Sequence, residues 1–99
     1  MAAEDDLREI YTYIADRTEE ATAFNYIRRI LRWCRSLETF PMRGSSRDDL
    51  RRGLRVAGFE RRASIAFAVT GGTVRIVRIL YGGRDLPSVD FTPEIDPES

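Results

Sequence analysis

Apolar residues near the start of the chain recur with the 3.6-residue period of an α-helix. Between residues 4 and 17, Leu7, Ile10, Tyr11 and Ile14 fall at i, i+3, i+4 and i+7, which places all four on one face. Acidic residues fill the first turn of this segment, where the positive end of the helix dipole favours negative charge. The pattern predicts an amphipathic helix over residues 4–17.

A second helical pattern covers residues 19–39 and stops before Pro41. At ~100° per residue its apolar positions span an arc of about 200°, well beyond one packing face. Tyr26 and Trp33, seven residues apart, widen the arc on one flank. Thr18 is the predicted N-cap, and the short link predicts an antiparallel hairpin. Two interpretations stay open: a helix clamped within its own domain, or a groove beside Trp33 that receives a partner helix.

After residue 50 the apolar period becomes two, which is typical of strands. The segment Thr70-Gly71-Gly72-Thr73 predicts a hairpin turn. Strict alternation sends Arg75 and Arg78 to opposite faces of the last strand, and its apolar residues on both faces indicate a covered, central strand. The predicted strands cover residues 51–57, 61–69 and 73–81.

These elements predict one α+β domain over residues 1–87, in which a two-helix hairpin packs on a small antiparallel sheet. Residues 88–99 form an acidic tail that contains Pro93 and Pro97 and is expected to lie outside the core. No apolar run approaches the ~20 residues that cross a bilayer, and the acidic N-terminus lacks a signal-peptide core. A cytoplasmic protein is expected.

The chain has a formal net charge of zero, but its charges are segregated. Residues 1–20 hold seven acids and two arginines, residues 21–84 hold fourteen arginines and four acids, and residues 85–99 hold five acids and no base. All 16 basic residues are arginines, and histidine is absent. The pattern indicates a cationic surface between acidic ends, suited to nucleic acid or to an acidic protein segment.

The residue types limit the chemistry that this surface can perform. Without histidine, and with Cys34 alone on an apolar helix face, no metal site and no cofactor are expected. Arginine binds phosphates and carboxylates but is too basic for efficient proton transfer. RNA cleavage would need Tyr81 or Glu60 as proton-transfer groups, so a non-enzymatic function is favoured.

The segments AEDDLREIYTYIAD at 3–16, RRGLRV at 51–56, RRASIAFAV at 61–69 and VRIVRILYGGRDLP at 74–87 resemble the ParE/RelE superfamily of bacterial toxins, most closely its ParE-like branch. The resemblance implies a toxin of a type II toxin–antitoxin system, with a cognate antitoxin in a hetero-oligomer and DNA gyrase as the target. Members of the superfamily normally begin with a strand, whereas here the helical pattern starts almost at Met1. Two interpretations stay open: the true start lies upstream, or the first strand is missing or short. If the strand is missing, the sheet edge that it would cover is expected to invite pairing with another chain.

Under this resemblance each site residue takes an expected role. The residues expected to bind the antitoxin are Tyr13, Tyr26, Trp33, Arg55, Arg75 and Arg78, and those expected to bind the target are Arg61, Arg62 and Arg84. One alternative is a RelE-like, ribosome-dependent mRNA endonuclease that uses Tyr81, Arg62 and Arg78. Another is a catalytically silent module that only binds antitoxin. Direct nucleic-acid binding is the secondary expectation.

Overall fold

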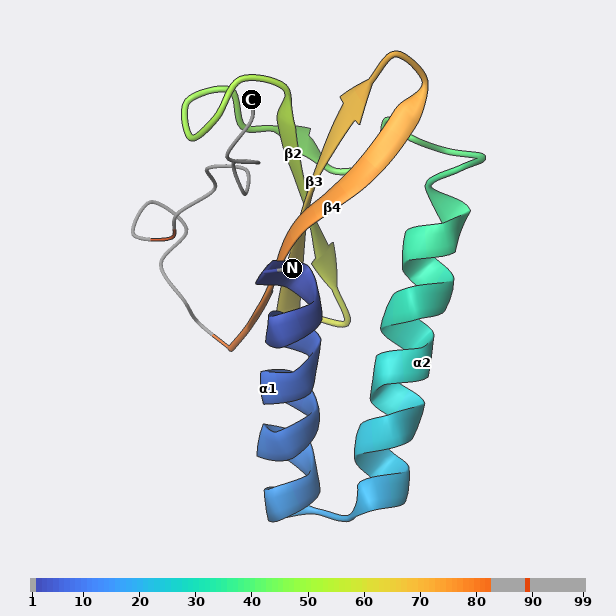
Figure 1. The fold of residues 1–99 in the computed structure, drawn as a ribbon, viewed down its shortest axis with the longest axis vertical. Coiled ribbons are helices and arrows are strands. Elements are labelled where there is room, and N and C mark those ends of the chain that lie inside the picture. The colour runs from blue at the N-terminus through green and yellow to red at the C-terminus, as the bar shows by residue number, and fades with distance from the viewer. Residues whose placement is uncertain (1, 83–88, 90–99) are drawn as a thin grey trace, which may run out of the picture.

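The computed structural model describes residues 2–82 and Val89, and it shows two antiparallel helices beside a twisted antiparallel sheet (Figure 1). The sheet has four strands in the order β1-β2-β3-β4, so each strand pairs with its neighbour in sequence. This architecture confirms the predicted α+β fold, with a helix as the first element. The elements are α1 (Ala2–Arg17), α2 (Glu20–Ser36), β1 (Ser45–Ser46), β2 (Leu54–Phe59), β3 (Ala63–Thr70) and β4 (Thr73–Tyr81). The predicted acidic tail lies outside the described residues, apart from Val89.

Several element boundaries differ by two or three residues from the sequence pattern, and two of the differences have local reasons. The strand expected from residue 51 begins at Leu54, because the Leu54 amide donates to the carbonyl of Arg51 and closes a turn. Thr18 does not cap α2; its hydroxyl donates to the carbonyl of Ile14 and so satisfies the last turn of α1. Glu19 occupies the N-cap position without a side-chain hydrogen bond.

The main core lies between the two helices and one face of the sheet. Ala23 and Ile30 of α2 are fully buried against this face, together with Ile65 and Phe67 of β3. Burying a side chain as large as Ile or Phe stabilises the fold by about 1.5–3 kcal/mol. Leu54, Ala66 and Leu80 form a smaller cluster on the other face. The sheet is therefore apolar on both faces. The prediction that the last strand is central was wrong, because β4 pairs only with β3 among the described strands and so lies at the edge of the described sheet.

A β-bulge in β4 changes which side chains share a face. Ala66 pairs with Arg78 and Phe67 pairs with Ile76, so Val77 is the extra residue. Arg75 pairs with Ala68, two residues from Ala66, and it therefore lies on the same face of the sheet as Arg78. The prediction that these arginines take opposite faces was wrong, because strict alternation fails at the bulge.

The wide apolar arc of α2 does leave a flank exposed, but not the flank that was expected. Tyr26 is buried and Trp33 is half-buried against the edge of the Phe67 ring, with 6.2 Å between ring centroids. Phe24 and Leu31, on the opposite flank, are 57% and 43% exposed. The apolar surface that α2 leaves uncovered by the described residues is therefore centred on Phe24 and Leu31.

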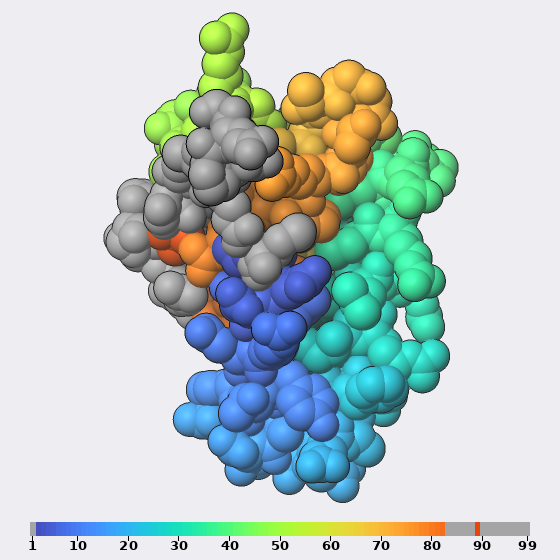
Figure 2. Space-filling view, viewed as in Figure 1, coloured from blue at the N-terminus to red at the C-terminus, as the bar shows by residue number. Residues whose placement is uncertain are grey.

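Helix α1 packs against both α2 and β4 (Figure 2), and a buried carboxylate fixes its position on β4. Asp6 accepts hydrogen bonds from Arg78 Nε at 2.7 Å, from Arg78 Nη2 at 2.9 Å and from the backbone amide of Ile79 at 2.9 Å. The Asp6 residue is only 4% exposed. Since β4 is the last strand of the sheet, this carboxylate binds a backbone group on the strand's outer edge.

Candidate functional site

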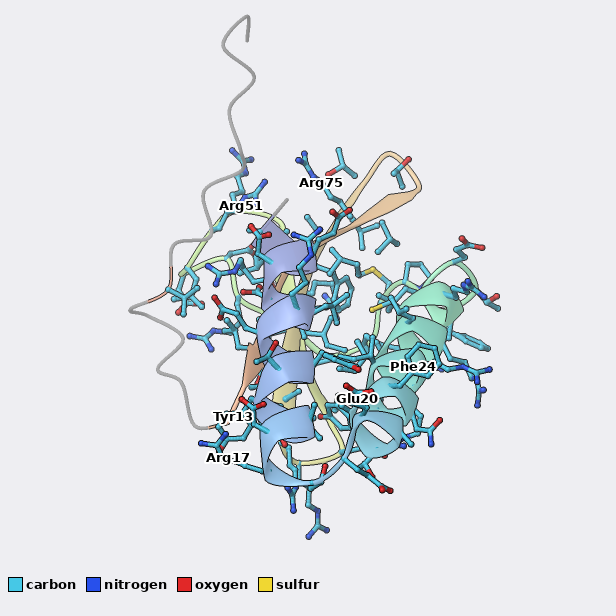
Figure 3. The ribbon with its side chains drawn as sticks, turned by 60° about the horizontal axis from the view of Figure 1, so that its bottom comes forward. Tyr13, Arg17, Glu20, Phe24, Arg51 and Arg75 are labelled. Atoms are coloured by element: carbon cyan, nitrogen blue, oxygen red, sulfur yellow. The ribbon has the colours of Figure 1, made fainter. Side chains whose placement is uncertain are left out.

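Aromatic and cationic side chains gather where the end of α1, the start of α2, the β2–β3 turn and the end of β4 meet. Two adjoining cavities, of about 530 Å³ and about 340 Å³, open there and share Ile14, Thr18, Arg62 and Tyr81 in their linings. Tyr13 and Arg17 lie together at this end of the molecule, whereas Arg51 and Arg75 lie at the opposite end (Figure 3). We call this site the tyrosine–arginine pocket, after Tyr13, Arg17, Tyr26, Arg61, Arg62 and Tyr81.

Three tyrosine rings form the aromatic part of the pocket. Tyr81 packs against Tyr13 with ring centroids 5.5 Å apart, and against Tyr26 with centroids 5.7 Å apart in an edge-to-face arrangement. Tyr26 also meets Phe59 edge to face. The guanidinium of Arg17 lies 3.6 Å from the centroid of the Tyr13 ring, a close cation–π contact. The pocket thus presents a cation directly on an aromatic surface.

The β2–β3 turn places two further arginines at the mouth of the pocket. Its closing bond runs from the Arg62 amide to the Phe59 carbonyl, and its two central residues, Glu60 and Arg61, have φ values of 48° and 61°. Positive φ at both positions defines a type I′ turn, which normally uses glycine or asparagine. Arg62 lies beside Tyr81 in the pocket lining, and the interaction with the Tyr81 side chain raises the pKa of the guanidinium above its ordinary value.

Tyr26 helps to line the smaller cavity, and its hydroxyl is buried. Although the residue is only 6% exposed, its hydroxyl has no hydrogen-bond partner in the described part of the chain. Burial, followed by the nearby Tyr81 and Glu60, raises its pKa from 10.0 to about 12. The hydroxyl therefore stays protonated at neutral pH and remains able to donate a hydrogen bond.

The pKa of Tyr26 makes stability fall at high pH. The unfolded chain loses the Tyr26 proton near pH 10, while the folded protein keeps it to about pH 12. The contribution of the protonated hydroxyl to the free energy of unfolding is therefore complete below pH 10 and declines above it. Between these two pKa values the free energy of unfolding should fall by roughly 2–3 kcal/mol. Denaturant unfolding between about pH 9 and 12 should show a shallower decline for Tyr26→Phe than for the parent chain. Cys34, whose pKa is raised by burial to about 11, titrates in both proteins and therefore does not cause the difference between them. An equal decline of the free energy of unfolding in the two proteins would contradict the raised pKa of Tyr26.

The remaining arginines of the sheet do not join the pocket. Arg55 donates to the carbonyls of Met42, Arg43 and Gly44 at 2.9–3.0 Å and so holds the loop before β1. Arg78 is bound to Asp6.

Arg75 is exposed on β4, and Arg84 lies outside the described residues. Trp33 lies away from the pocket, under the guanidinium of Arg43 at 5.7 Å from the ring centroid. The arginines of the sheet are thus divided between structural bonds and separate exposed positions.

Sequence reasoning selected Arg61, Arg62 and Tyr81 but did not place them beside Tyr13 and Tyr26. It missed Arg17, because an arginine in the last turn of a helix also suits the helix dipole. The positive-φ turn carried no sequence signal, since Glu60 and Arg61 are unusual residues for it. Across residues 2–82, no group of three or more His, Cys, Asp or Glu side chains could hold a metal ion. Within the same range, no helix has the length and apolarity that a membrane crossing requires.

The chain is thus a compact α+β domain, a two-helix hairpin on a small antiparallel sheet with an arginine-lined pocket at one end. The model of the family described as "ParE toxin of type II toxin-antitoxin system, parDE" matches residues 1–86, and the chain belongs to this family. A solved structure described as the chromosomal ParDE TA system from P. aeruginosa is similar, with a TM-score of 0.70 and 26% identity. The match covers 82% of this chain and 88% of that one. No curated protein matches significantly.

Proposed function

We propose that this ParE-family toxin inhibits DNA gyrase and is held inactive by a cognate antitoxin. The family match over residues 1–86 is the observation that carries the proposal. The chemistry of the tyrosine–arginine pocket supports a binding function over catalysis. The arginines of the pocket can bind an anion. Glu60, a carboxylate in the pocket lining, accepts hydrogen bonds from Arg29 at 3.1–3.3 Å. The sequence contains no histidine to act as a general base.

The antitoxin is proposed to wrap the exposed surfaces on both sides of the helical hairpin. Tyr13, Trp33 and Arg75 reach the surface and are available for direct contact, and Phe24 and Leu31 offer the apolar strip that an amphipathic helix would cover. Arg55, Arg78 and Tyr26 are held in internal contacts. Their contribution to antitoxin binding is therefore to support this surface from within.

The target is proposed to contact the pocket end of the sheet through Arg61 and Arg62, with Arg84 following in sequence. The double charge reversal Arg61→Glu/Arg62→Glu should weaken inhibition of gyrase supercoiling at least ~10-fold, because each change replaces attraction by repulsion. Arg52→Glu is the matched control, since Arg52 is exposed but lies outside the pocket. It should retain inhibition.

Full inhibition by the double variant would show that the pocket arginines do not bind the target. Absence of inhibition by the parent chain would show that gyrase is not the target. Induction of the chain in cells separates the alternatives. DNA breaks with an SOS response support gyrase. Transcripts cut in phase with codons would instead indicate a RelE-like endonuclease that uses Tyr81 and Arg62, and unimpaired growth would indicate a silent antitoxin-binding module.

A further inference from the structure

The tyrosine–arginine pocket holds three arginines that form no ion pair with a carboxylate of the described residues. Among the described residues, ion pairs with carboxylates are formed by Arg8, Arg47 and Arg78 away from the pocket, and by Arg29 with Glu60 in the lining of the smaller cavity. Arg17, Arg61 and Arg62 form no such ion pair with any described residue, although all three line the larger cavity. Three guanidiniums around one opening suit a group with several anionic oxygens, and a phosphate is such a group.

The backbone of the β2–β3 turn supports a functional reason for this arrangement. The chain uses Gly71 and Gly72, with φ values of 55° and 81°, for its other two-residue hairpin turn. At the pocket it uses Glu60 and Arg61 in the same left-handed region, where side chains other than glycine are strained. Strained backbone of this kind persists at binding sites, where the side chains are needed.

The cavities beside these arginines have the size of a ligand site. The smaller cavity, which Tyr26 helps to line, adjoins the larger one at Arg62 and Tyr81. Volumes of about 530 and 340 Å³ fall within the range of small-molecule sites, roughly 300–1,000 Å³. The rings of Tyr13 and Tyr81 add aromatic surface beside the cations.

We propose that this pocket binds a phosphorylated nucleoside. The phosphate lies among Arg17, Arg61 and Arg62, and the base contacts the rings of Tyr13 and Tyr81. The same chemistry occurs in a free mononucleotide and at the 5′-phosphorylated end of a nucleic-acid strand. The inference rests on the pocket itself and not on the identity of the toxin's target.

Calorimetric titration of the purified full-length chain tests the ligand class. AMP should bind at least ~10-fold more tightly than adenosine or inorganic phosphate, because only AMP engages both cations and rings. A 5′-phosphorylated trinucleotide, compared with its 5′-hydroxyl form, tests for a strand end. Tighter binding of the phosphorylated trinucleotide than of AMP assigns the strand end as the source, whereas tighter binding of AMP assigns the free nucleotide. No binding of either at millimolar concentration overturns the proposal, and phosphate binding as tightly as AMP overturns the role of the rings.

The turn variant Glu60→Asn/Arg61→Gly separates function from structure. Asn-Gly is the preferred sequence of a type I′ turn, so thermal unfolding should shift upward by about 4–8 °C while AMP affinity falls at least ~10-fold. Arg61→Glu should lose affinity similarly, and Arg52→Glu should keep it. Unchanged affinity in the turn variant, or equal loss in Arg52→Glu, would show that the strained turn serves no ligand. These measurements contain no gyrase, so their failure leaves the proposed target untouched.

Discussion

Replacing Asp6 by alanine is expected to lower the free energy of unfolding by about 3–5 kcal/mol, the usual cost of breaking a buried ion pair. The variant leaves the Arg78 guanidinium, whose side chain is 17% exposed, without its carboxylate. It also removes the acceptor of the Ile79 amide. Since single domains are stable by only about 5–15 kcal/mol, this one change removes a large share of the stability of the fold.

Urea unfolding followed by circular dichroism measures this effect, with Asp5→Ala as the matched control. Asp5 precedes Asp6 on the same helix and pairs with Arg8 at 3.1 Å, but both side chains are largely exposed. Its loss should cost no more than about 0.5 kcal/mol. The double variant Asp6→Ala/Arg78→Met should regain part of the stability, because it also removes the guanidinium whose charge the Asp6 carboxylate balanced. Similar midpoints for Asp6→Ala and Asp5→Ala would contradict the structural role of Asp6.

The second large effect is expected from Gly44→Ala, which should destabilise the protein by about 2–4 kcal/mol through backbone strain and overpacking together. Gly44 has φ +73°, and a Cβ there would collide with the carbonyl group of Val56 in β2 and touch the Cβ of Ala57. Neither backbone can move freely, because Ser45 pairs with Val56 in the adjoining β1–β2 ladder.

Gly71→Ala provides the comparison for Gly44→Ala. Gly71 also has a positive φ, +55°, but no atom of the described chain beyond its immediate neighbours lies within 4 Å of the position that a Cβ would occupy. The Gly71 variant should therefore show the conformational cost alone, about 1–2 kcal/mol. Thermal unfolding of the two variants side by side gives the difference. If both lose the same stability, the close approach to Val56 is not what requires glycine at position 44.

The sequence pattern predicted the hairpin of helices and the three longer strands because each has a clear apolar period. Two features of the sheet escaped it. The strand Ser45–Ser46 has only two polar residues and therefore no period. The bulge at Val77 shifts the facing of β4 through its pairing with β3, and local residue types do not reveal such a shift.

The residues of the pocket were likewise predicted only in part from the sequence. Arg61, Arg62 and Tyr81 stood out as cations and a phenol near strand ends, but their neighbours come from α1 and α2, far away in sequence. Periodicity could assign Tyr26 to the apolar face of its helix, yet only the packed rings show that its hydroxyl is buried without a partner among the described residues. Arg55 and Arg78 resembled surface cations because sequence alone cannot show the carbonyl and carboxylate groups they bind.

Asp6 also has a consequence for self-association. An edge strand offers free amide and carbonyl groups on which the same strand of another molecule can stack, and a charged group directed at that edge is a common protection. Asp6 supplies the charge at Ile79 and occupies the amide that an incoming strand would need. Damage to this contact would therefore favour growth of intermolecular sheets, so that Asp6→Ala would lose yield through precipitation even under conditions in which its fold survives.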